Sequence, residues 1–284
     1  MNLDAPANFV HTGAKLATMT QASLYMGILE QKKSQERMGT IVSLDLARWA
    51  IKDLSNKLPI DSAIWKSIRN KDITRKIREF LWKSMHNAHK CGKFWNNIPG
   101  LEQRATCPVC NEEESMEHIL LECNAPGQKI IWKLTKELWL KKHDTWPVLK
   151  YGAILGCSMA DFKIEEGAPQ QGKNRLYRIL MSESAFLIWK LRCERRISKE
   201  DDPEKFHSET EIHNRWVATI NNRLNLDKLM TNHKKYGKKA LKERAVIQTW
   251  TKTLYDENNL LDNWLQQSGV LVGIRARRPP GRNR

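Results

Sequence analysis

The feature that most constrains this chain is a short segment with four potential metal ligands, CPVCNEEESMEHILLEC. Cys107, Cys110, His118 and Cys123 form a Cys-x2-Cys-x7-His-x4-Cys pattern. Thiolate and imidazole donors favour zinc, and two cysteines separated by two residues can place both sulfurs on one turn. Because four protein ligands leave no open position for a reactive water, the pattern predicts a structural Zn²⁺ site. The alternative is a lone cysteine pair with a histidine and a cysteine on a buried face.

The spacing of His118 and Cys123 also constrains the backbone between them. On an ideal α-helix, residues five apart point about 140° away from each other, so they cannot both reach one ion. We therefore expect the helix through residues 117–121 to unwind just before Cys123. Pro126 and Gly127 follow, and both residue types are common after a helix ends.

The remaining histidines and cysteines near the pattern are interpreted differently. His86, His89 and Cys91 are close enough in sequence to compete as ligands, but we interpret them as surface polar groups. Cys157 and Cys193 lie in apolar contexts and are expected to be small core residues.

Apolar residues recur at helical spacing along most of the chain, which predicts a mainly α fold. We expect a helical domain held together by a small Cys-Cys-His-Cys zinc knuckle, followed by a second helical carboxyl-terminal part. Helices are predicted at 14–33, 42–58, 72–89, 128–142, 174–196, 207–229 and 235–265. Asp72 is expected to cap the third of them.

Composition divides the chain into four predicted parts. An amino-terminal helical segment covers 1–60, a zinc-binding domain 61–151, and a basic helical region with an Arg-rich tail 173–284. Residues 152–172 are rich in glycine and end in a polar run, which favours a linker. No segment has the roughly 20 apolar residues that span a bilayer, and MNLDAPANFV is unlike a secretory signal. The expectation is an intracellular protein, nuclear or cytoplasmic, without membrane contact.

The charge of the chain favours polyanionic partners, because its formal net charge is +16. The cysteine segment itself is acidic. It contains Glu112, Glu113, Glu114, Glu117 and Glu122 but no Lys or Arg. Three thiolates and a dication add one more negative charge, so this loop should repel phosphate. We therefore expect zinc to fix the neighbouring helices, with nucleic acid bound elsewhere.

The candidates for contact with RNA or DNA are basic residues around the third predicted helix and in the terminal arm 275–284. They are Lys66, Arg69, Arg75, Lys76, Arg78, Lys83, Lys90, Lys93, Arg275, Arg277 and Arg278. A solvated basic face without any ligand is the alternative. Trp95 is the candidate for an exposed platform on which bases stack. Other tryptophans lie in apolar helical stripes and are expected in the core: Trp65, Trp82, Trp132, Trp139, Trp189 and Trp216.

The segment from FLWKSMHNAH to HILLEC resembles the zinc-binding domain of non-LTR retrotransposon reverse transcriptases, especially those of mushroom-forming fungi. The resemblance rests on the Phe-Leu-Trp-Lys core at 80–83, the Cys-x2-Cys pair, the acidic loop and the His before the last Cys. GAKLATMTQASLY at 13–25 resembles the segment that follows ribonuclease H in such polyproteins. GVLVGI at 269–274 is similar to their carboxyl terminus.

The resemblance implies a non-catalytic, nucleic-acid-associated terminal piece of such a polyprotein, with 1–60 following a missing ribonuclease H. The sequence has neither the carboxylate cluster of a ribonuclease H nor the Tyr/Phe-x-Asp-Asp turn of a polymerase. Expected partners are RNA or DNA through backbone contacts, and the parent reverse transcriptase or ribonuclease H. The alternatives are a zinc-stabilised protein-interaction scaffold and a decayed transposon remnant without activity.

Overall fold

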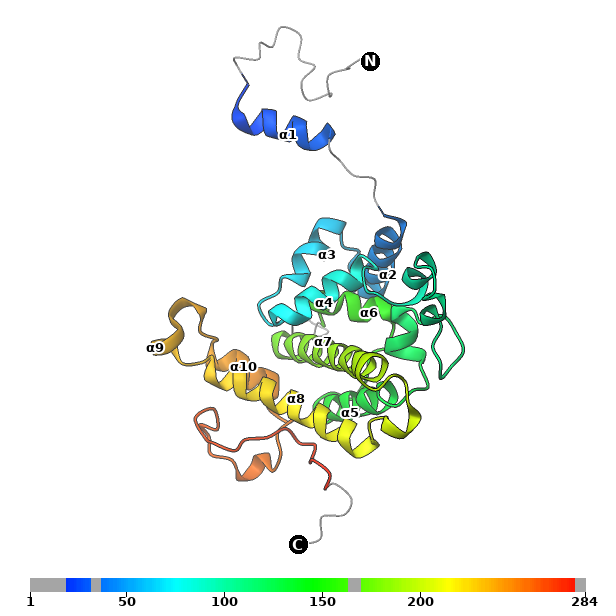
Figure 1. Cartoon of the computed structure of the whole chain (residues 1–284). Helices are drawn as coiled ribbons and strands as arrows, with labels where there is room; N and C mark the ends of the chain where they lie inside the picture. The colour runs from blue at the N-terminus through cyan, green and yellow to red at the C-terminus, as the bar shows by residue number, and fades with distance from the viewer. Residues whose placement is uncertain (1–18, 32–36, 163–169, 279–284) are drawn as a thin grey trace, which may run out of the picture. The chain divides into compact units, whose positions relative to one another are not determined.

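The computed structural model describes residues 19–31, 37–162 and 170–278, and the chain divides into two compact units. The first unit is Met1–Met38, and its described part consists mainly of α1 (Gln21–Gln31) (Figure 1). Apolar residues of α1 are exposed: Tyr25, Met26, Ile28 and Leu29. Most of the predicted helix 14–33 is thus present, while its first residues lie outside the described ones.

The second unit is Gly39–Arg284 and is built from helices joined by turns. Its α-helices are α2 (Met38–Ser55), α3 (Asp61–Ile68), α4 (Arg75–Met85), α5 (Gln128–Leu140), α6 (Tyr151–Leu155), α7 (Gln171–Cys193), α8 (Glu209–Leu229), α9 (His233–Tyr236) and α10 (Glu243–Trp250). Shorter helical turns are η3 (Gly92–Asn97), η4 (Glu102–Ala105), η5 (His118–Glu122), η6 (Cys157–Met159), η7 (Glu194–Ser198), η8 (Pro203–Lys205), η9 (Gly237–Lys239) and η10 (Glu257–Asn259).

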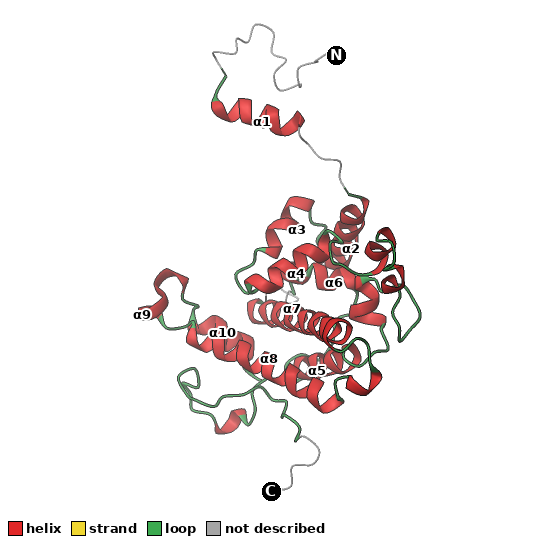
Figure 2. Ribbon diagram, in the orientation of Figure 1, coloured by secondary structure: helices red, strands yellow, loops and turns green. Residues whose placement is uncertain are grey.

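The described residues contain no β-strand, which confirms the predicted mainly α fold (Figure 2). Extended pairing is limited there to two isolated bridges, Thr106 with Glu113 and Leu254 with Val272. None of the helices in the described part of the chain is long and apolar enough to cross a membrane.

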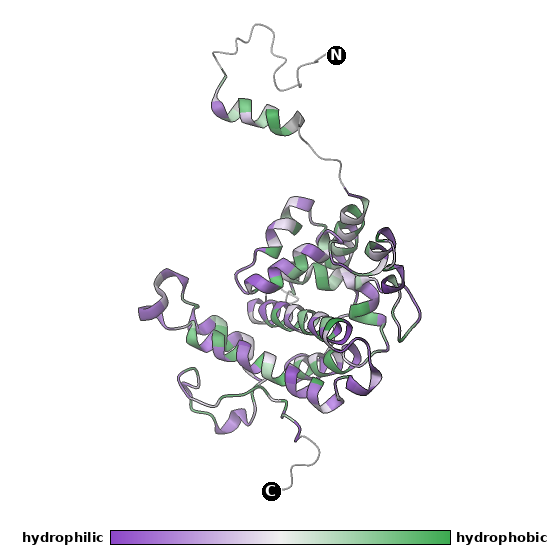
Figure 3. Cartoon of the chain, in the orientation of Figure 1, coloured by the Kyte–Doolittle hydropathy of each residue, from purple (hydrophilic) through white to green (hydrophobic). Residues whose placement is uncertain are grey.

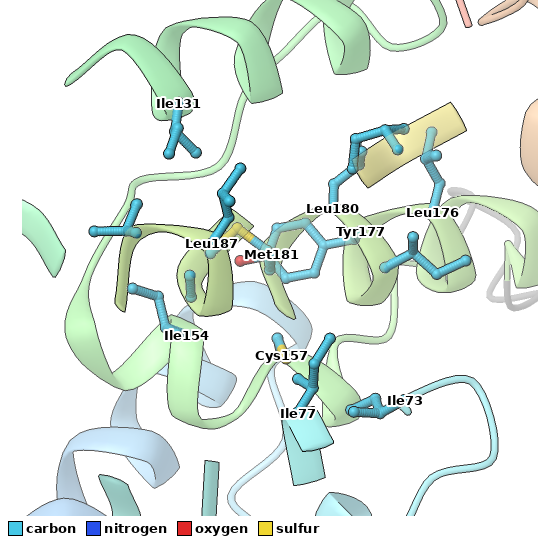
Figure 4. Packing of buried hydrophobic residues seen from close by; sticks show 14 of the residues in the cluster. Ile73, Ile77, Ile131, Ile154, Cys157, Leu176, Tyr177, Leu180, Met181 and Leu187 are labelled. Carbon is cyan, nitrogen blue, oxygen red and sulfur yellow. The ribbon is translucent and has the colours of Figure 1, made fainter. Parts of the chain in front are cut away.

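Helix α7 is the centre of the second unit, because it packs against α4 and α6 on one side and against α5, α8 and α10 on the other (Figure 1). Its sequence places apolar residues on more than one face, which is typical of a helix buried all round. Ile77 of α4 and Tyr177 of α7 belong to the same buried cluster as Ile131 of α5 and Ile154 of α6 (Figure 4). Unlike α7, the short helix α9 consists of hydrophilic residues (Figure 3).

A buried ion network fixes the start of α7 to its neighbours. Arg175 donates to Asp72 at 2.9 Å and to Asp227 of α8 at 2.6 Å, and Arg178 donates to Asp72 at 2.5 Å. Burial alone would raise the pKa of Asp72, but the charges of Arg175 and Arg178 outweigh it and lower that pKa. The prediction that Asp72 caps a helix is therefore wrong. Thr74 occupies the N-cap of α4, because the Asp72 carboxylate is needed by the two arginines.

The predicted linker at 152–172 is wrong for its first residues, which form α6 and η6 and are mostly buried. The glycines there serve close packing. A Cβ on Gly152 would lie 2.0 Å from the carbonyl oxygen of Leu46, and one on Gly172 would lie 2.1 Å from that of Gln248. Residues 163–169 lie outside the described ones. Because α7 shares one core with α4, α5 and α6, the helices on both sides of the predicted linker pack as one unit.

Several further predictions were wrong because tertiary packing overrides local patterning. The predicted helix 235–265 is reduced to α10, with turns on both sides. His89 and Cys91 are buried, although we expected surface positions. Trp82 is 50% exposed and Leu46 41% exposed, although their helical spacing suggested the core.

Candidate metal centre and adjacent groove

The four predicted zinc ligands come together at one place in the second unit. One donor atom from each of Cys107, Cys110, His118 and Cys123 lies within 4.8 Å of the others. The sulfur of Cys123 lies 3.8 Å from that of Cys107 and 3.9 Å from that of Cys110. In a tetrahedral site with zinc–sulfur bonds of about 2.3 Å, two sulfurs lie roughly 3.8 Å apart. The spacing therefore fits zinc, and it is far too long for a disulfide.

A tight loop positions the first two sulfurs. The Cys107 N–H donates to the Glu112 carbonyl at 2.8 Å, and the Asn111 N–H donates to the Cys107 carbonyl at 2.8 Å. Asn111 has a φ of 58°, a left-handed conformation that asparagine tolerates better than most residues. The loop thereby turns Cys110 back toward Cys107.

The second pair of ligands is brought together by a wide helical turn. Residues His118–Glu122 form the π-helical turn η5, in which the Cys123 N–H donates to the His118 carbonyl at 2.8 Å. A turn closed over five residues brings residue i+5 round to the side of residue i. The sequence prediction that an α-helix must be abandoned here is correct, but the backbone widens before it leaves the helix at Cys123.

The protonation of the thiols suits a metal site. A hydrogen bond between the sulfurs of Cys107 and Cys123 is the largest influence on both groups: it lowers the pKa of Cys107 and raises that of Cys123. One thiolate is thus favoured at neutral pH, and a bound cation would take the place of the proton that Cys123 retains. Backbone N–H groups support the sulfurs, since Asn124 donates to Cys110 at 3.1 Å.

His118 is buried, and neither of its ring nitrogens has a hydrogen-bond partner in the part of the chain that the structure describes. An unpartnered buried imidazole is costly unless it binds an ion. Its Nδ1 lies 3.5 Å from a carboxylate oxygen of Glu112. That carboxylate can orient the ring as a hydrogen-bond acceptor if Nε2 binds the metal. The residues present therefore fit zinc.

Comparison with known protein families identifies this segment. Residues 49–132, which include all four ligands, match the family described as zinc-binding in reverse transcriptase. This segment is similar to the zinc-binding domain of reverse transcriptases. The match covers less than a third of the chain, and no curated protein and no solved structure matched. The predicted resemblance is confirmed for this segment, and its three cysteines and His118 form a cluster that could hold the structural Zn²⁺.

The zinc-binding domain is attached to the end of α7 through Glu114, which is fully buried. Its carboxylate accepts from Arg192 Nε at 3.1 Å and from Arg195 Nη2 at 3.4 Å, and Arg196 Nε lies 3.4 Å away. Glu114 is counted in the sequence analysis among the acidic residues that repel phosphate, but here its charge is buried against three arginines. Its neighbours Glu112, Glu113, Glu117 and Glu122 are exposed.

The arginines near Glu114 also balance the charge of the metal centre. Three guanidinium groups face the two carboxylates of Glu114 and Asp201. This cluster therefore has a net charge of +1. Three thiolates with Zn²⁺ carry one negative charge. Arg195 and Cys123 line the same small cavity of about 20 Å³. The excess charge of the arginines therefore lies beside the thiolates and favours their ionised form.

A groove of about 1060 Å³ lies near the metal centre, between α4, η3 and η4 of the zinc-binding domain and the end of α7. Cationic side chains line it: Lys76, Lys83, Lys90, Arg104, Arg192 and Arg196. So do aromatic side chains: Phe80, His89, Trp95, Phe186 and Trp189. The acidic lining residues are Glu79, Glu200 and Asp201, so cations outnumber carboxylates.

The loop between Cys110 and His118, here called the zinc loop, holds one wall of this groove in place. The Glu114 N–H donates to the Ala105 carbonyl of η4 at 2.8 Å, and Lys93 of η3 lies 3.9 Å from the Glu113 carboxylate. On the opposite wall, Arg196 donates to the Arg104 carbonyl at 2.9 Å. The contacts that connect the zinc loop to η3 and η4 therefore also fix the position of a groove wall.

The predicted nucleic-acid contacts are distributed over several places. The groove brings together Lys76, Lys83, Lys90 and Trp95, and Lys93 lies on the same turn as Trp95. Four others do not line it: Lys66 and Arg69 at the end of α3, and Arg75 and Arg78 on α4.

The described part of the terminal arm runs along α8. The carbonyl of Arg275 lies 2.8 Å from His213 Nε2, and the Arg277 carbonyl accepts from Asn214 at 2.7 Å. The side chains of Arg275, Arg277 and Arg278 are exposed. Residues 279–284 lie outside the described ones.

Sequence reasoning missed the contribution of α7 to the groove. From the sequence, Trp189 is expected in the core, and no contact is assigned to Arg192 of α7 or to Arg196 of the following turn η7. The run RCERR, with basic residues on successive turns, was the available signal. Which surface it faces depends on packing with α4 and η4, and the periodicity of α7 does not contain that information.

Proposed function

We propose that this chain is a non-catalytic, nucleic-acid-associated module of a retrotransposon reverse transcriptase, in which zinc holds the walls of a nucleic-acid-binding groove. The observation that carries the proposal is the groove itself, which combines cations from α4, η4 and α7 with an aromatic lining. Phosphate backbones bind to clustered Lys and Arg, while aromatic rings accept bases.

Three cations of the groove are available for phosphate. Lys76, Lys90 and Arg104 are exposed, and no carboxylate within ion-pair distance of them is found among the described residues. Lys83 pairs with Glu79 at 2.7 Å, and Arg196 pairs with Asp201 at 2.8 Å. These three unpaired cations therefore supply most of the electrostatic attraction of the groove for phosphate groups.

Zinc has a structural role in this proposal. Four protein ligands leave the ion no open position, so its contribution is to fix the loop from which Glu114 and Glu113 reach the groove walls. No residue of this chain is assigned a catalytic role. The surface acidic residues of the loop repel phosphate and leave the groove as the favoured site.

The test is a fluorescence-anisotropy titration of labelled oligonucleotides at several salt concentrations. Binding should weaken steeply with salt, with a slope near −0.7 to −0.9 for each phosphate contacted. Replacing Lys76, Lys90 and Arg104 by Glu should reduce affinity and make the slope shallower. The matched control replaces Lys238 and Lys239 of η9, which are exposed and outside the groove, by Glu. Binding that is independent of salt, or unaffected by the groove variant, would refute the proposal.

The second candidate function is a protein-interaction scaffold whose acidic knuckle binds a basic partner such as the parent reverse transcriptase. The exposure of Glu112 and Glu117 favours it. Replacing both by Ala should abolish binding to the isolated polymerase domain if the chain is a scaffold, and should leave or improve nucleic-acid affinity if it is not. Glu114 is unsuitable for this test because it is buried.

A further inference from the structure

We infer that the groove between the zinc-binding domain and the end of α7 is a site for single-stranded RNA or DNA, in which unpaired bases stack on its aromatic wall and floor. The inference rests on the proposed function and specifies its ligand. Duplexes keep their base faces stacked inside the helix, so they could use only the cations of such a groove.

The first observation is the wall formed by Trp95 and Arg104. The indole N–H of Trp95 donates to the Lys90 carbonyl at 3.1 Å, which fixes the ring, and the guanidinium carbon of Arg104 lies 5.3 Å from the ring centroid. Trp95 is half-buried and Arg104 is exposed. An indole and a guanidinium are both planar surfaces on which an unpaired base can stack.

The second observation is the aromatic floor. Phe80 of α4 lies 5.6 Å from Phe186 and 6.3 Å from Trp189, both on α7, measured between ring centroids. His89 lies 4.4 Å from Trp189, and burial lowers its pKa to about 4, so it is uncharged at neutral pH. Phe186 and Trp189 are half-buried and supply the accessible surface of this floor, whereas Phe80 and His89 are buried and pack against them. The uncharged rings of Phe186 and Trp189 suit the face of a base.

The third observation is the placement of charge around the floor. Lys76 comes from α4, Lys90 from the segment after it and Arg104 from η4, so cations come from separate elements that border one groove. The volume of about 1060 Å³ is at the upper end of the roughly 300–1,000 Å³ typical of small-molecule pockets. A strand of several nucleotides, with phosphates at the rim and bases inside, matches this arrangement.

The experiment compares one sequence in three forms, a 12-nucleotide RNA, the same DNA strand and the corresponding DNA duplex, at matched salt. We expect either single strand to bind at least ten-fold more tightly than the duplex. Trp95→Ala should weaken single-strand binding by about five-fold to more than a hundred-fold, since each stacked base contributes on that scale. Its effect on duplex binding and on the salt slope should be small.

Two further variants distinguish stacking from a loss of structure. Trp95→Phe keeps an aromatic face and should restore most of the affinity. Trp82→Ala removes a tryptophan that is exposed but does not line the groove, and it should leave binding unchanged. Zinc content and circular dichroism should match the unmodified chain for every variant used.

The outcomes separate the inference from the proposed function. Equal affinity for strand and duplex, or normal single-strand binding by Trp95→Ala, would overturn the inference while the groove stays a nucleic-acid site. If none of the three forms bound in a salt-sensitive way, both the inference and the proposed function would be refuted.

Discussion

The carboxylate of Glu114, on the zinc loop, is held by the guanidinium of Arg192 near the end of α7 through two hydrogen bonds. One of them, from Arg192 Nε, is 3.1 Å long, and the other joins Nη2 to the second carboxylate oxygen. Glu114 is 0% exposed, and Arg195 and Arg196 lie against the same carboxylate. This contact joins the metal centre to the central helix of the fold.

Glu114→Gln should therefore destabilise the chain strongly. The change removes the negative charge of the fully buried Glu114 carboxylate, which faces the buried Arg195 and the half-buried Arg192 and Arg196. Breaking a buried ion pair in this way costs about 3–5 kcal/mol. Urea unfolding followed by circular dichroism would measure the loss. Glu113→Gln is the control, because Glu113 is exposed and its ion pair with Lys93 should contribute less than about 1 kcal/mol. Equal stability of the two variants would contradict the role given to Glu114.

Loss of a zinc ligand should remove both the metal and the local fold. We expect one zinc ion per purified chain, and none in Cys107→Ser or His118→Ala, as measured by elemental analysis. Hydrogen exchange should then accelerate in η3, η4 and η5, because the metal fixes them. Cys193→Ser is the control, since Cys193 is not a ligand, and it should retain its zinc. Full zinc content in the ligand variants would contradict the assigned site.

Asp72→Asn distinguishes an ion-network role from a capping role. Loss of an N-cap costs typically about 1 kcal/mol, whereas loss of the charge between Arg175 and Arg178 should cost about 3–5 kcal/mol. The unfolding free energy at neutral pH measures the difference. Asp45→Asn serves as the control because Asp45, which pairs with Arg48, is exposed. A loss for Asp72→Asn no larger than about 1 kcal/mol would restore the capping interpretation.

His89 should make stability depend on acidity. Burial lowers its pKa to about 4, helped by the charges of Lys83 and Arg192 and opposed by Glu79 and the Phe80 carbonyl. In the unfolded chain its pKa is about 6.5, so the unfolded state takes up the proton first as pH falls. The stability from His89 is complete above pH 6.5 and is lost progressively toward pH 4, on the order of 3 kcal/mol in all.

Urea unfolding across this pH range would measure that loss. His89→Gln should flatten the dependence, while the exposed His233→Gln should leave it unchanged. Zinc release also depends on protons, so metal content must be followed in each sample. An unaltered pH profile in His89→Gln would show that another group titrates in this range.

The sequence by itself determined the features that depend on residues close together in the chain. The spacing of Cys107, Cys110, His118 and Cys123 was sufficient to predict the metal site, because ligand geometry restricts such a pattern to few structures. Helical periodicity was sufficient for α5, α7 and α8, which are the longest helices that follow α2 in the second unit. Even the departure from a regular α-helix before Cys123 followed from the angle between residues five apart.

Tertiary structure alone decided the features that join distant parts of the chain. Glu114 and Arg192 are 78 residues apart, and Asp72 and Arg175 are 103 residues apart. A carboxylate in a local pattern is equally suited to a cap, a solvated loop or a buried pair, and only packing selects among them. The groove exists because α7 brings Trp189 and Arg192 to the same cavity as Lys76 of α4 and Trp95 of η3. That arrangement is set by how the helices share one core.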